Sequence, residues 1–341
     1  MDQLSYGDVK QAADRISGRV RPVTVAPVDP EAVRGLRPAA PGGYRLWLAL
    51  EQLQHTGSFK ARGAQNFLAA HRESGTLPDA GVTIASGGNA GLACAWAARQ
   101  QGVRATVFLP ATAPAVKVAK LRGYGADVRL VGNEYAEALA ACEDFVRTTG
   151  ALASHAYAHP LIAAGAGTLL EELRGRIPGL DTVVVAVGGG GLFAGAATAA
   201  RHHGIRTVAV EPENCRALNA ALEAGRPVDV SVDSIAADSL GARRASPLAL
   251  AAAQQDGVTS LLVPDAEIVR ARQTLWDDHR LAVEHAAATA LAALTAGTAT
   301  GTGGAGGGTS GYLPADGEKV AVVLCGANTD PSDLVPPRSE S

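Results

Sequence analysis

Four consecutive glycines at 188–191 constrain the fold of this chain more than any other stretch. They divide an uncharged segment, 182–200, that would otherwise be nearly long enough to span a membrane. The β-branched and small residues at 182–187 predict a buried strand, and the small residues at 192–202 predict a helix. A strand, a tight turn and a helix in this order are typical of a βαβ unit with a parallel sheet.

The same alternation of strand-length and helix-length segments extends through most of the chain. Strands are predicted at 44–50, 81–85, 105–109, 127–131, 182–187, 207–210, 261–263 and 319–324. Helices are predicted at 6–16, 61–71, 92–100, 113–123, 135–148, 192–202, 217–224, 248–255, 265–278 and 286–295, with another that ends near 176. The proline-rich stretch 21–41 predicts irregular chain. The pattern predicts an α/β protein with mostly parallel sheets flanked by helices.

Composition excludes several classes of function. A chain of 341 residues that is 47% hydrophobic more often forms two domains than one. A net charge of -3 favours neither nucleic acid nor a membrane surface as a partner. The 4 cysteines form no CxxC pair, which argues against a disulfide framework or a zinc site. The N-terminus lacks the pattern of a signal peptide, so we expect a cytoplasmic protein.

Four loops follow predicted strands, at 51–64, 86–91, 188–191 and 325–328. In open α/β sheets, ligands bind outside the carboxyl ends of the strands. We therefore expect the chemistry to lie where these loops converge.

The glycine loop 188–191 favours a phosphate site, because backbone N–H groups and a helix N-terminus can surround an anion there. The loop also fits a dinucleotide fingerprint, with Gly189, Gly191 and Ala194 in G-x-G-x-x-A and Glu211 about twenty residues further on. A NAD(P)-dependent oxidoreductase is therefore an alternative. Close packing of helix on strand, without a ligand, is a third interpretation.

The stretch 51–64 places Lys60 where a helix is expected to begin. The positive end of the helix dipole and removal from water both favour the neutral amine, which can form a Schiff base. Without the other motifs, Lys60 is better interpreted as an ordinary surface lysine. The loop 86–91 similarly suits a small carboxylate or a cofactor hydroxyl, but an N-cap formed by Ser86 or Asn89 explains it at least as well.

Together, the motifs at 51–64, 86–91, 188–192 and 325–328 resemble those of the serine/threonine dehydratases (ammonia-lyases). These are fold type II pyridoxal phosphate enzymes of the tryptophan-synthase-β-like group. A dinucleotide fold would not require the lysine turn ahead of the glycine loop, so the resemblance favours pyridoxal phosphate.

The resemblance also implies a division into two domains. Residues 1–81 and 158–341 would form a large cofactor-binding domain, and 82–157 a small mobile domain that grips the substrate. Within the large domain we expect a flexible Gly-rich loop at 297–311 and a fraying tail at 331–341.

The resemblance implies a role for each matching residue. Lys60 would form the internal aldimine and then take the substrate α-proton, Phe59 would pack on the pyridine ring, and Asn89 would hydrogen-bond the ring hydroxyl. Cys325 would face the pyridine nitrogen as a neutral thiol, which favours β-elimination over transamination. Ser86 is expected to be both catalytic and substrate-binding. The loop for the substrate carboxylate would comprise Ser86, Gly87, Asn89 and Ala90, and the phosphate cradle Gly188, Gly189, Gly190, Gly191 and Leu192.

Further positions match the family less closely. Glu211, with the carbonyl of Cys215, resembles a cation site of some members, and Ala217 in place of an acidic residue points to a monovalent ion. Glu284 falls at a glutamate near the family's site. Gly87 stands where serine racemases carry a serine, which disfavours racemisation.

The function implied is the β-elimination of L-threonine and/or L-serine, a small amino-acid substrate, to 2-oxobutanoate or pyruvate and ammonia by a homodimer. The alternatives are a pyridoxal phosphate lyase or β-replacement enzyme for another 3-hydroxy amino acid, a non-catalytic pyridoxal-binding relative, and the NAD(P)-dependent oxidoreductase.

Overall fold

The computed structural model describes residues 3–36, 43–295 and 311–335. Its strands are β1 (Val25–Val28), β2 (Arg45–Ala49), β3 (Val82–Ile84), β4 (Ala105–Leu109), β5 (Asp127–Leu130), β6 (Leu152–Ala153), β7 (Thr182–Ala186), β8 (Arg206–Pro212), β9 (Val258–Val263) and β10 (Lys319–Val323). Its α-helices are α1 (Tyr6–Ile16), α2 (Lys60–Glu73), α3 (Asn89–Gln100), α4 (Ala115–Gly123), α5 (Tyr135–Thr149), α6 (Pro160–Arg176), α7 (Gly191–His202), α8 (Ala217–Ala224), α9 (Ala237–Leu240), α10 (Pro247–Ala253), α11 (Asp265–His279) and α12 (His285–Thr295). Short 3-10 helices are η1 (Pro30–Ala32), η2 (Glu51–Leu53), η3 (His55–Gly57) and η4 (Pro331–Leu334).

The larger sheet has 6 strands in the order β1-β2-β10-β7-β8-β9. Every neighbouring pair is parallel except β1 with β2. Val322 of β10 lies opposite Leu48 of β2 on one side and Val184 of β7 on the other, and all three side chains are buried. Helices α7 and α12 both pack on β7 and β8. This continuous apolar centre is typical of a parallel sheet covered by helices.

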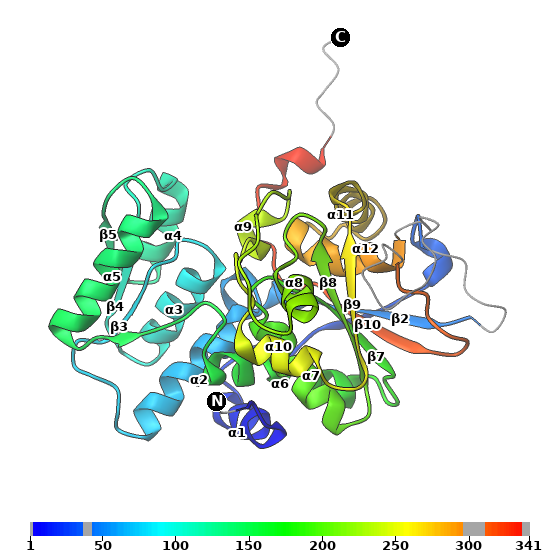
Figure 1. The fold of residues 1–341 in the computed structure, drawn as a ribbon, viewed down its shortest axis with the longest axis horizontal. Helices are drawn as coiled ribbons and strands as arrows, with labels where there is room; N and C mark the ends of the chain where they lie inside the picture. Colours follow the sequence, from blue (N-terminus) through cyan, green and yellow to red (C-terminus); the bar gives the residue numbers. More distant parts are fainter. Residues whose placement is uncertain (1–2, 37–42, 296–310, 336–341) are drawn as a thin grey trace, which may run out of the picture.

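The smaller sheet has 4 parallel strands in the order β5-β4-β3-β6 and lies at the opposite end of the molecule from β2 (Figure 1). It has its own hydrophobic core, shared with α2 and α3, which includes Leu68 and Trp96. The prediction of an α/β fold with mostly parallel sheets and flanking helices is confirmed. No helix in the described ranges is long and apolar enough to cross a membrane.

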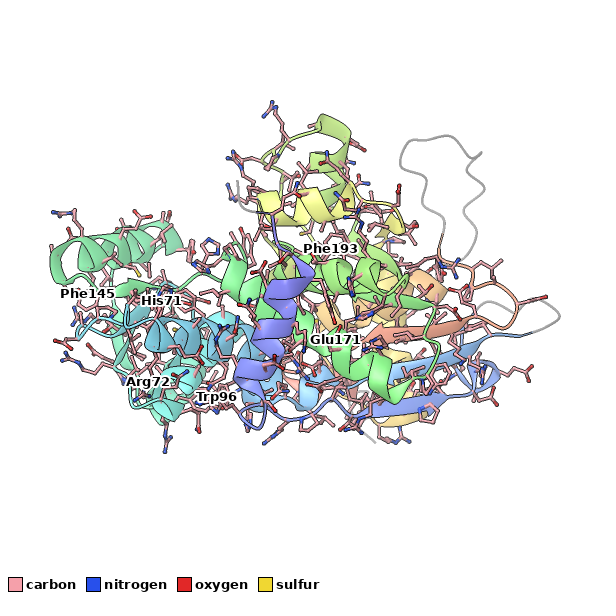
Figure 2. All side chains as sticks on the ribbon, turned by 90° about the horizontal axis from the view of Figure 1, so that it is seen from below. His71, Arg72, Trp96, Phe145, Glu171 and Phe193 are labelled. Carbon is pink, nitrogen blue, oxygen red and sulfur yellow. The ribbon has the colours of Figure 1, made fainter. Side chains whose placement is uncertain are left out.

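Helices α2, α6 and α7 are held together by glycines. A Cβ at Gly195 of α7 would lie 2.1 Å from the carbonyl oxygen of Ala163 in α6, and a Cβ at Gly165 of α6 would lie 2.7 Å from the carbonyl oxygen of Arg62 in α2. Helix α1 packs across all three, and Phe193 of α7 is fully buried nearby (Figure 2). Because backbones touch without side chains between them, α6 sets the distance from α2 to α7.

The stretch 21–41 contains β1, which the sequence did not predict. The strand lies at the edge of the sheet and is antiparallel to β2, with Pro27 opposite Trp47. An edge strand tolerates proline because its outward N–H needs no partner. The prediction of irregular chain is therefore wrong over these four residues.

The C-terminal segment also differs from the prediction. Residues 331–334 form η4 instead of a fraying tail. Arg272 of α11 donates hydrogen bonds of 2.7 and 3.0 Å to the Asp333 carboxylate, and Leu334 is buried. These contacts anchor a segment whose polar composition predicted that it would be exposed to solvent. Residues 336–341, and the predicted loop 297–311 except for its last residue, lie outside the described residues.

Candidate active site

The four loops at the strand ends meet around one cavity of about 720 Å³, between the two sheets. The predicted site residues that line it are Phe59, Lys60, Ser86, Gly87, Asn89, Ala90, Gly188, Gly189, Gly190, Gly191, Leu192 and Cys325. Glu211 and Cys215 do not line it. The structure therefore gathers all the residues predicted for cofactor and substrate and leaves out those predicted for a cation.

Lys60 is the first residue of α2, and the turn before it is tied to the end of β10. The Phe59 N–H donates to the Cys325 carbonyl at 3.0 Å, and Ser58 forms a β-bridge with Gly326. The Lys60 amine donates to the carbonyl of Ala156 at 3.1 Å and lies 4.7 Å from the centre of the Phe59 ring. Burial lowers the pKa of Lys60 to about 8. A lysine of this kind supplies a neutral, nucleophilic amine in mildly alkaline solution.

The helix that follows loop 86–88 begins at Asn89, three residues earlier than predicted. Its N-cap is Gly88, and no side chain caps the helix, so the N-cap interpretation of Ser86 and Asn89 is wrong. A Cβ at Gly91 would lie 1.8 Å from the Ser86 carbonyl oxygen, which explains why this turn needs a glycine. The uncapped N–H groups of α3 lie at the cavity wall, where a helix N-terminus favours negative charge.

The Asn89 side chain is held by a hydrogen-bond hub at Glu284. Its amide nitrogen donates to both Glu284 oxygens, at 2.9 and 3.0 Å, and its amide oxygen accepts from Asn328 at 2.7 Å. Ser239 Oγ and the Asn328 backbone N–H also donate to Glu284, each at 2.7 Å. The hub joins α3, α9, α12 and the end of β10, and it fixes the orientation of the asparagine. The sequence placed Glu284 near the site and Asn328 in a loop at the site, but it assigned Asn328 no role and did not reveal Ser239.

The glycine loop forms a second uncapped helix start. Gly190 is the N-cap of α7 with φ +90, and a Cβ there would lie 2.3 Å from the Ala249 Cβ. A Cβ at Gly189 would lie 2.3 Å from the ring of Tyr157, which packs directly on the loop. Two helix N-termini, those of α3 and α7, thus face one cavity, as a ligand with a phosphate and a carboxylate requires.

Tyr157 is a site residue that the sequence did not reveal. It lies in the short link between β6 and α6, and its hydroxyl donates to the carbonyl of Arg244 at 3.3 Å. The same link supplies the Ala156 carbonyl to Lys60. One signal was available: among the described residues, this link is where the chain returns from the small sheet to the large one, between which the cavity lies.

Cys325 lies two residues after the end of β10 and is 6% exposed. Burial raises the pKa of its thiol to about 12, so the group stays protonated and neutral near pH 7. Cys325 therefore contributes an uncharged side chain to the cavity lining.

Glu211 is fully buried outside the cavity. One carboxylate oxygen accepts from the Leu218 N–H at 2.7 Å and the other from the Asn219 N–H at 2.8 Å, so the side chain caps the start of α8. Burial raises the pKa of Glu211 to about 8. The side chain has no exposed surface and does not line the cavity, so it is not placed to bind the ribose that the dinucleotide alternative requires. Among the described residues, no group of three or more His, Cys, Asp and Glu side chains could hold a metal ion.

Comparisons with known proteins identify the family of the chain. Residues 33–326 match the family described as pyridoxal-phosphate dependent enzyme. The chain is 36% identical over 292 residues to a serine dehydratase-like protein of Mus musculus, covering 84% of this chain and 86% of the relative. It is 34% identical over 293 residues to L-threonine ammonia-lyase of Geobacter sulfurreducens, covering 85% and 71%. The crystal structure of serine racemase from Dictyostelium discoideum superposes with a TM-score of 0.81 at 27% identity, covering 96% and 99%. The chain belongs to the serine/threonine dehydratase family of fold type II pyridoxal phosphate enzymes.

Proposed function

We propose that the protein is a pyridoxal phosphate-dependent ammonia-lyase that converts L-threonine, L-serine or both to 2-oxobutanoate or pyruvate and ammonia. The observation that carries the proposal is one cavity that holds a buried lysine amine, two uncapped helix N-termini and a neutral thiol. The names of the similar proteins support a hydroxy amino acid as the substrate.

The cavity fits pyridoxal phosphate group by group. Lys60 suits the aldehyde, the loop from Gly188 to Leu192 suits the phosphate, and the neutral Cys325 suits an unprotonated pyridine nitrogen. The missing side chain at Gly190 lets the loop pack against Ala249 with a positive φ, and this packing sets the shape of the cradle. When bound, the cofactor supplies an electron sink next to the substrate α-carbon.

With the cofactor bound, each residue named below would have its own role in the reaction. The neutral Lys60 amine removes the α-proton, and the loop beginning at Ser86 binds the substrate carboxylate with the N–H groups of α3. Phe59 supports the ring from the side of the lysine, and Asn89, oriented by Glu284, presents its amide to the ring hydroxyl. Loss of the β-hydroxyl as water, followed by hydrolysis, gives the keto acid and ammonia.

Racemisation is the second candidate, because a serine racemase structure is similar. It requires a proton donor on the face of the substrate opposite Lys60. Gly87 offers no side chain there, and a Cβ at Gly87 would lie 2.9 Å from Leu109 Cδ2. This packing favours elimination.

The experiment that tests the function measures keto-acid release. The purified protein, loaded with pyridoxal phosphate, is given L-serine, L-threonine, 3-phenylserine and 3-hydroxyaspartate in turn, and D-serine is assayed in parallel. We expect keto acid from L-serine or L-threonine. D-serine alone, or a protein that stays colourless with added cofactor, contradicts the proposal, and release only from the other two substrates corrects the substrate class.

The lowered pKa of Lys60 predicts how covalent cofactor attachment depends on pH. Lys60 keeps its proton below about pH 8 and loses it above, whereas an ordinary lysine loses it near 10.5. The neutral amine is the nucleophile, so the attachment rate should rise about tenfold per pH unit below pH 8 and then level off. Stopped-flow absorbance of the apoprotein mixed with excess cofactor measures this rate. An attachment rate that continues to rise up to the ordinary lysine pKa of 10.5 contradicts the buried environment assigned to Lys60.

We further propose that residues 82–157 move as a unit over the substrate. They carry a sheet of their own, whose hydrophobic core also includes residues of α2, and the ion pair of 3.0 Å between Lys117 of α4 and Asp238 of α9 joins two parts of the cavity lining. A homodimer, a cytoplasmic location and a monovalent cation near Glu211 also stay proposals, supported by the resemblance to the family.

A further inference from the structure

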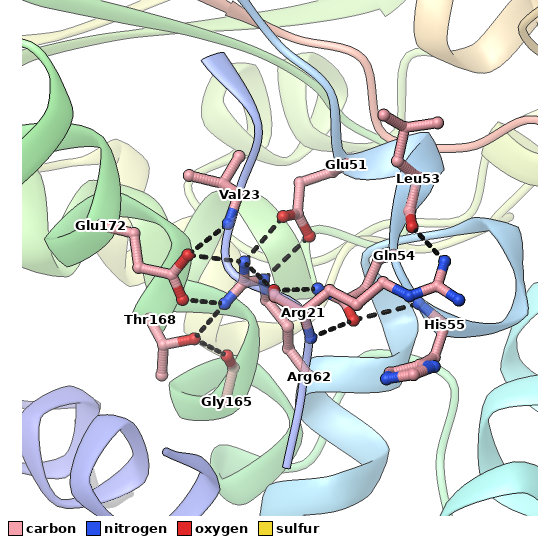
Figure 3. Close-up of polar contacts among 10 residues, drawn as sticks. All are labelled: Arg21, Val23, Glu51, Leu53, Gln54, His55, Arg62, Gly165, Thr168 and Glu172. Atoms are coloured by element: carbon pink, nitrogen blue, oxygen red, sulfur yellow. Dashed lines mark hydrogen bonds and ion pairs between the residues drawn. The ribbon is translucent and has the colours of Figure 1, made fainter. Parts of the chain in front are cut away.

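Arg62 forms a buried ionic network beside the lysine turn (Figure 3). The Arg62 side chain has no exposed surface. Its Nε and Nη2 donate to the two Glu51 oxygens at 2.8 and 2.7 Å, as a parallel fork. Its Nη1 and Nη2 donate to Glu172 at 2.6 and 3.2 Å. One guanidinium thus binds two carboxylates, and such bidentate pairs fix orientation as well as distance.

The two carboxylates belong to different parts of the fold. Glu51 lies at the end of β2 and begins the lysine turn, whereas Glu172 lies on α6 and also accepts the backbone N–H of Val23 at 2.6 Å. Arg62 follows Lys60 by two residues, in the first turn of α2. The Glu51–Arg62 pair therefore joins the two ends of the turn that presents Lys60, and the Glu172–Arg62 pair joins α2 to α6.

The turn between Glu51 and Arg62 needs such a tie. It contains two 3-10 helices in succession, and Thr56 has φ 64, a left-handed conformation that is strained for a β-branched residue. The buried hydroxyl of Ser58 makes no hydrogen bond in the described structure. Strained backbone persists only where surrounding contacts over-determine it. The buried fork at Arg62 is a charge-assisted, bidentate contact that spans this turn from one end to the other.

We propose that Glu51 and Arg62 are positioning residues for Lys60: their ion pair closes the turn and holds the lysine amine in the orientation needed for cofactor attachment and α-proton removal. The inference rests on the proposed role of Lys60. Glu172 serves a different purpose, as the anchor of α2 on α6.

Two isosteric substitutions separate these roles. Glu51→Gln and Glu172→Gln each remove one carboxylate from the same guanidinium and leave the other pair in place. For each variant, the rate of covalent cofactor attachment, kcat, KM and the thermal unfolding midpoint are measured. Both variants are expected to lose stability, because each leaves the buried Arg62 charge paired with one carboxylate instead of two.

The two variants should differ in the reaction rates that depend on Lys60. Glu51→Gln should lower the attachment rate and kcat by about 10- to 100-fold with little change in KM, because a small misplacement of a reacting group has effects of this size. Glu172→Gln should keep both rates within about 3-fold of the wild type, since the fork that closes the turn is intact. Equal losses in the two variants, or full rates in Glu51→Gln, overturn the inference.

A further variant covers the case in which Glu51→Gln does not fold. Glu51→Asp keeps the charge but shortens the side chain, so it should fold and still attach the cofactor more slowly than the wild type. An unchanged attachment rate in Glu51→Asp, with Glu51→Gln unfolded, overturns the positioning role in favour of a purely structural one. If the wild type itself attaches no cofactor, the proposed function fails, and that result is distinct from a failure of the positioning role.

Discussion

Replacing Lys60 with alanine is expected to abolish covalent cofactor attachment and to lower keto-acid release by about 10³-fold or more, the effect of losing a nucleophile that is also the base. The Lys60 amine lines the cavity beside the Ala156 carbonyl. In the described cavity lining the other lysine is Lys117, which is engaged with Asp238. No neighbouring amine is therefore placed to substitute for Lys60.

Three measurements check this result: the violet absorbance of the loaded protein, the mass added after borohydride reduction, and keto-acid release. The matched control is Lys120→Ala, since Lys120 is an exposed lysine of α4 outside the cavity. This control should keep the absorbance and the activity. A Lys60→Ala protein that still carries a borohydride-reducible cofactor would assign the covalent bond to another residue.

Gly190→Ala is expected to weaken pyridoxal phosphate binding by about 10-fold or more and to lower the free energy of unfolding by about 1–3 kcal/mol, the range for strained backbone and overpacking. Gly190 has φ +90, and the new Cβ would lie 2.3 Å from the Ala249 Cβ. Relief of this contact must move the glycine loop or α10, and either movement disturbs the cradle. Equilibrium dialysis of the cofactor and urea unfolding of the apoprotein measure the two effects.

The control lies at the other end of the same helix. Gly204 has φ +68, and a Cβ there meets nothing within 4 Å. Gly204→Ala should therefore lose stability through backbone strain alone and keep its cofactor affinity. If both variants bind the cofactor equally, the glycine loop is not the phosphate cradle.

Local pattern was sufficient for most of the fold. The runs rich in valine that became β7 and β10 are buried on both faces along nearly their whole length, and such strands carry the strongest sequence signal. The elements that were missed have little pattern of their own. Strand β6 has only two residues, and β1 contains Pro27, so both form because a neighbouring strand offers hydrogen-bond partners.

The site was predictable where the chain itself forms the ligand surface, as in the glycine loop and the lysine turn. It was not predictable where residues act through distant contacts. Tyr157 covers Gly189, and Ser239 binds Glu284, only because the fold brings α9 and the link after β6 to the cavity. Glu211 shows the opposite error. Its spacing from the glycine loop matched the dinucleotide fingerprint, but its carboxylate oxygens accept hydrogen bonds from the backbone at the start of α8.

The glycine contacts between α2, α6 and α7 have an evolutionary consequence. Lys60 begins α2 and the glycine loop begins α7, so the backbone contacts at Gly165 and Gly195 hold the proposed nucleophile and the proposed phosphate cradle on one rigid frame. The cavity walls from α4 and α9 do not belong to that frame. Mutations in those walls, apart from Ser239, which holds Glu284 and through it Asn89, can change which amino acid fits without disturbing the groups proposed to react. Chemistry and substrate choice can therefore diverge independently in descendants of this chain.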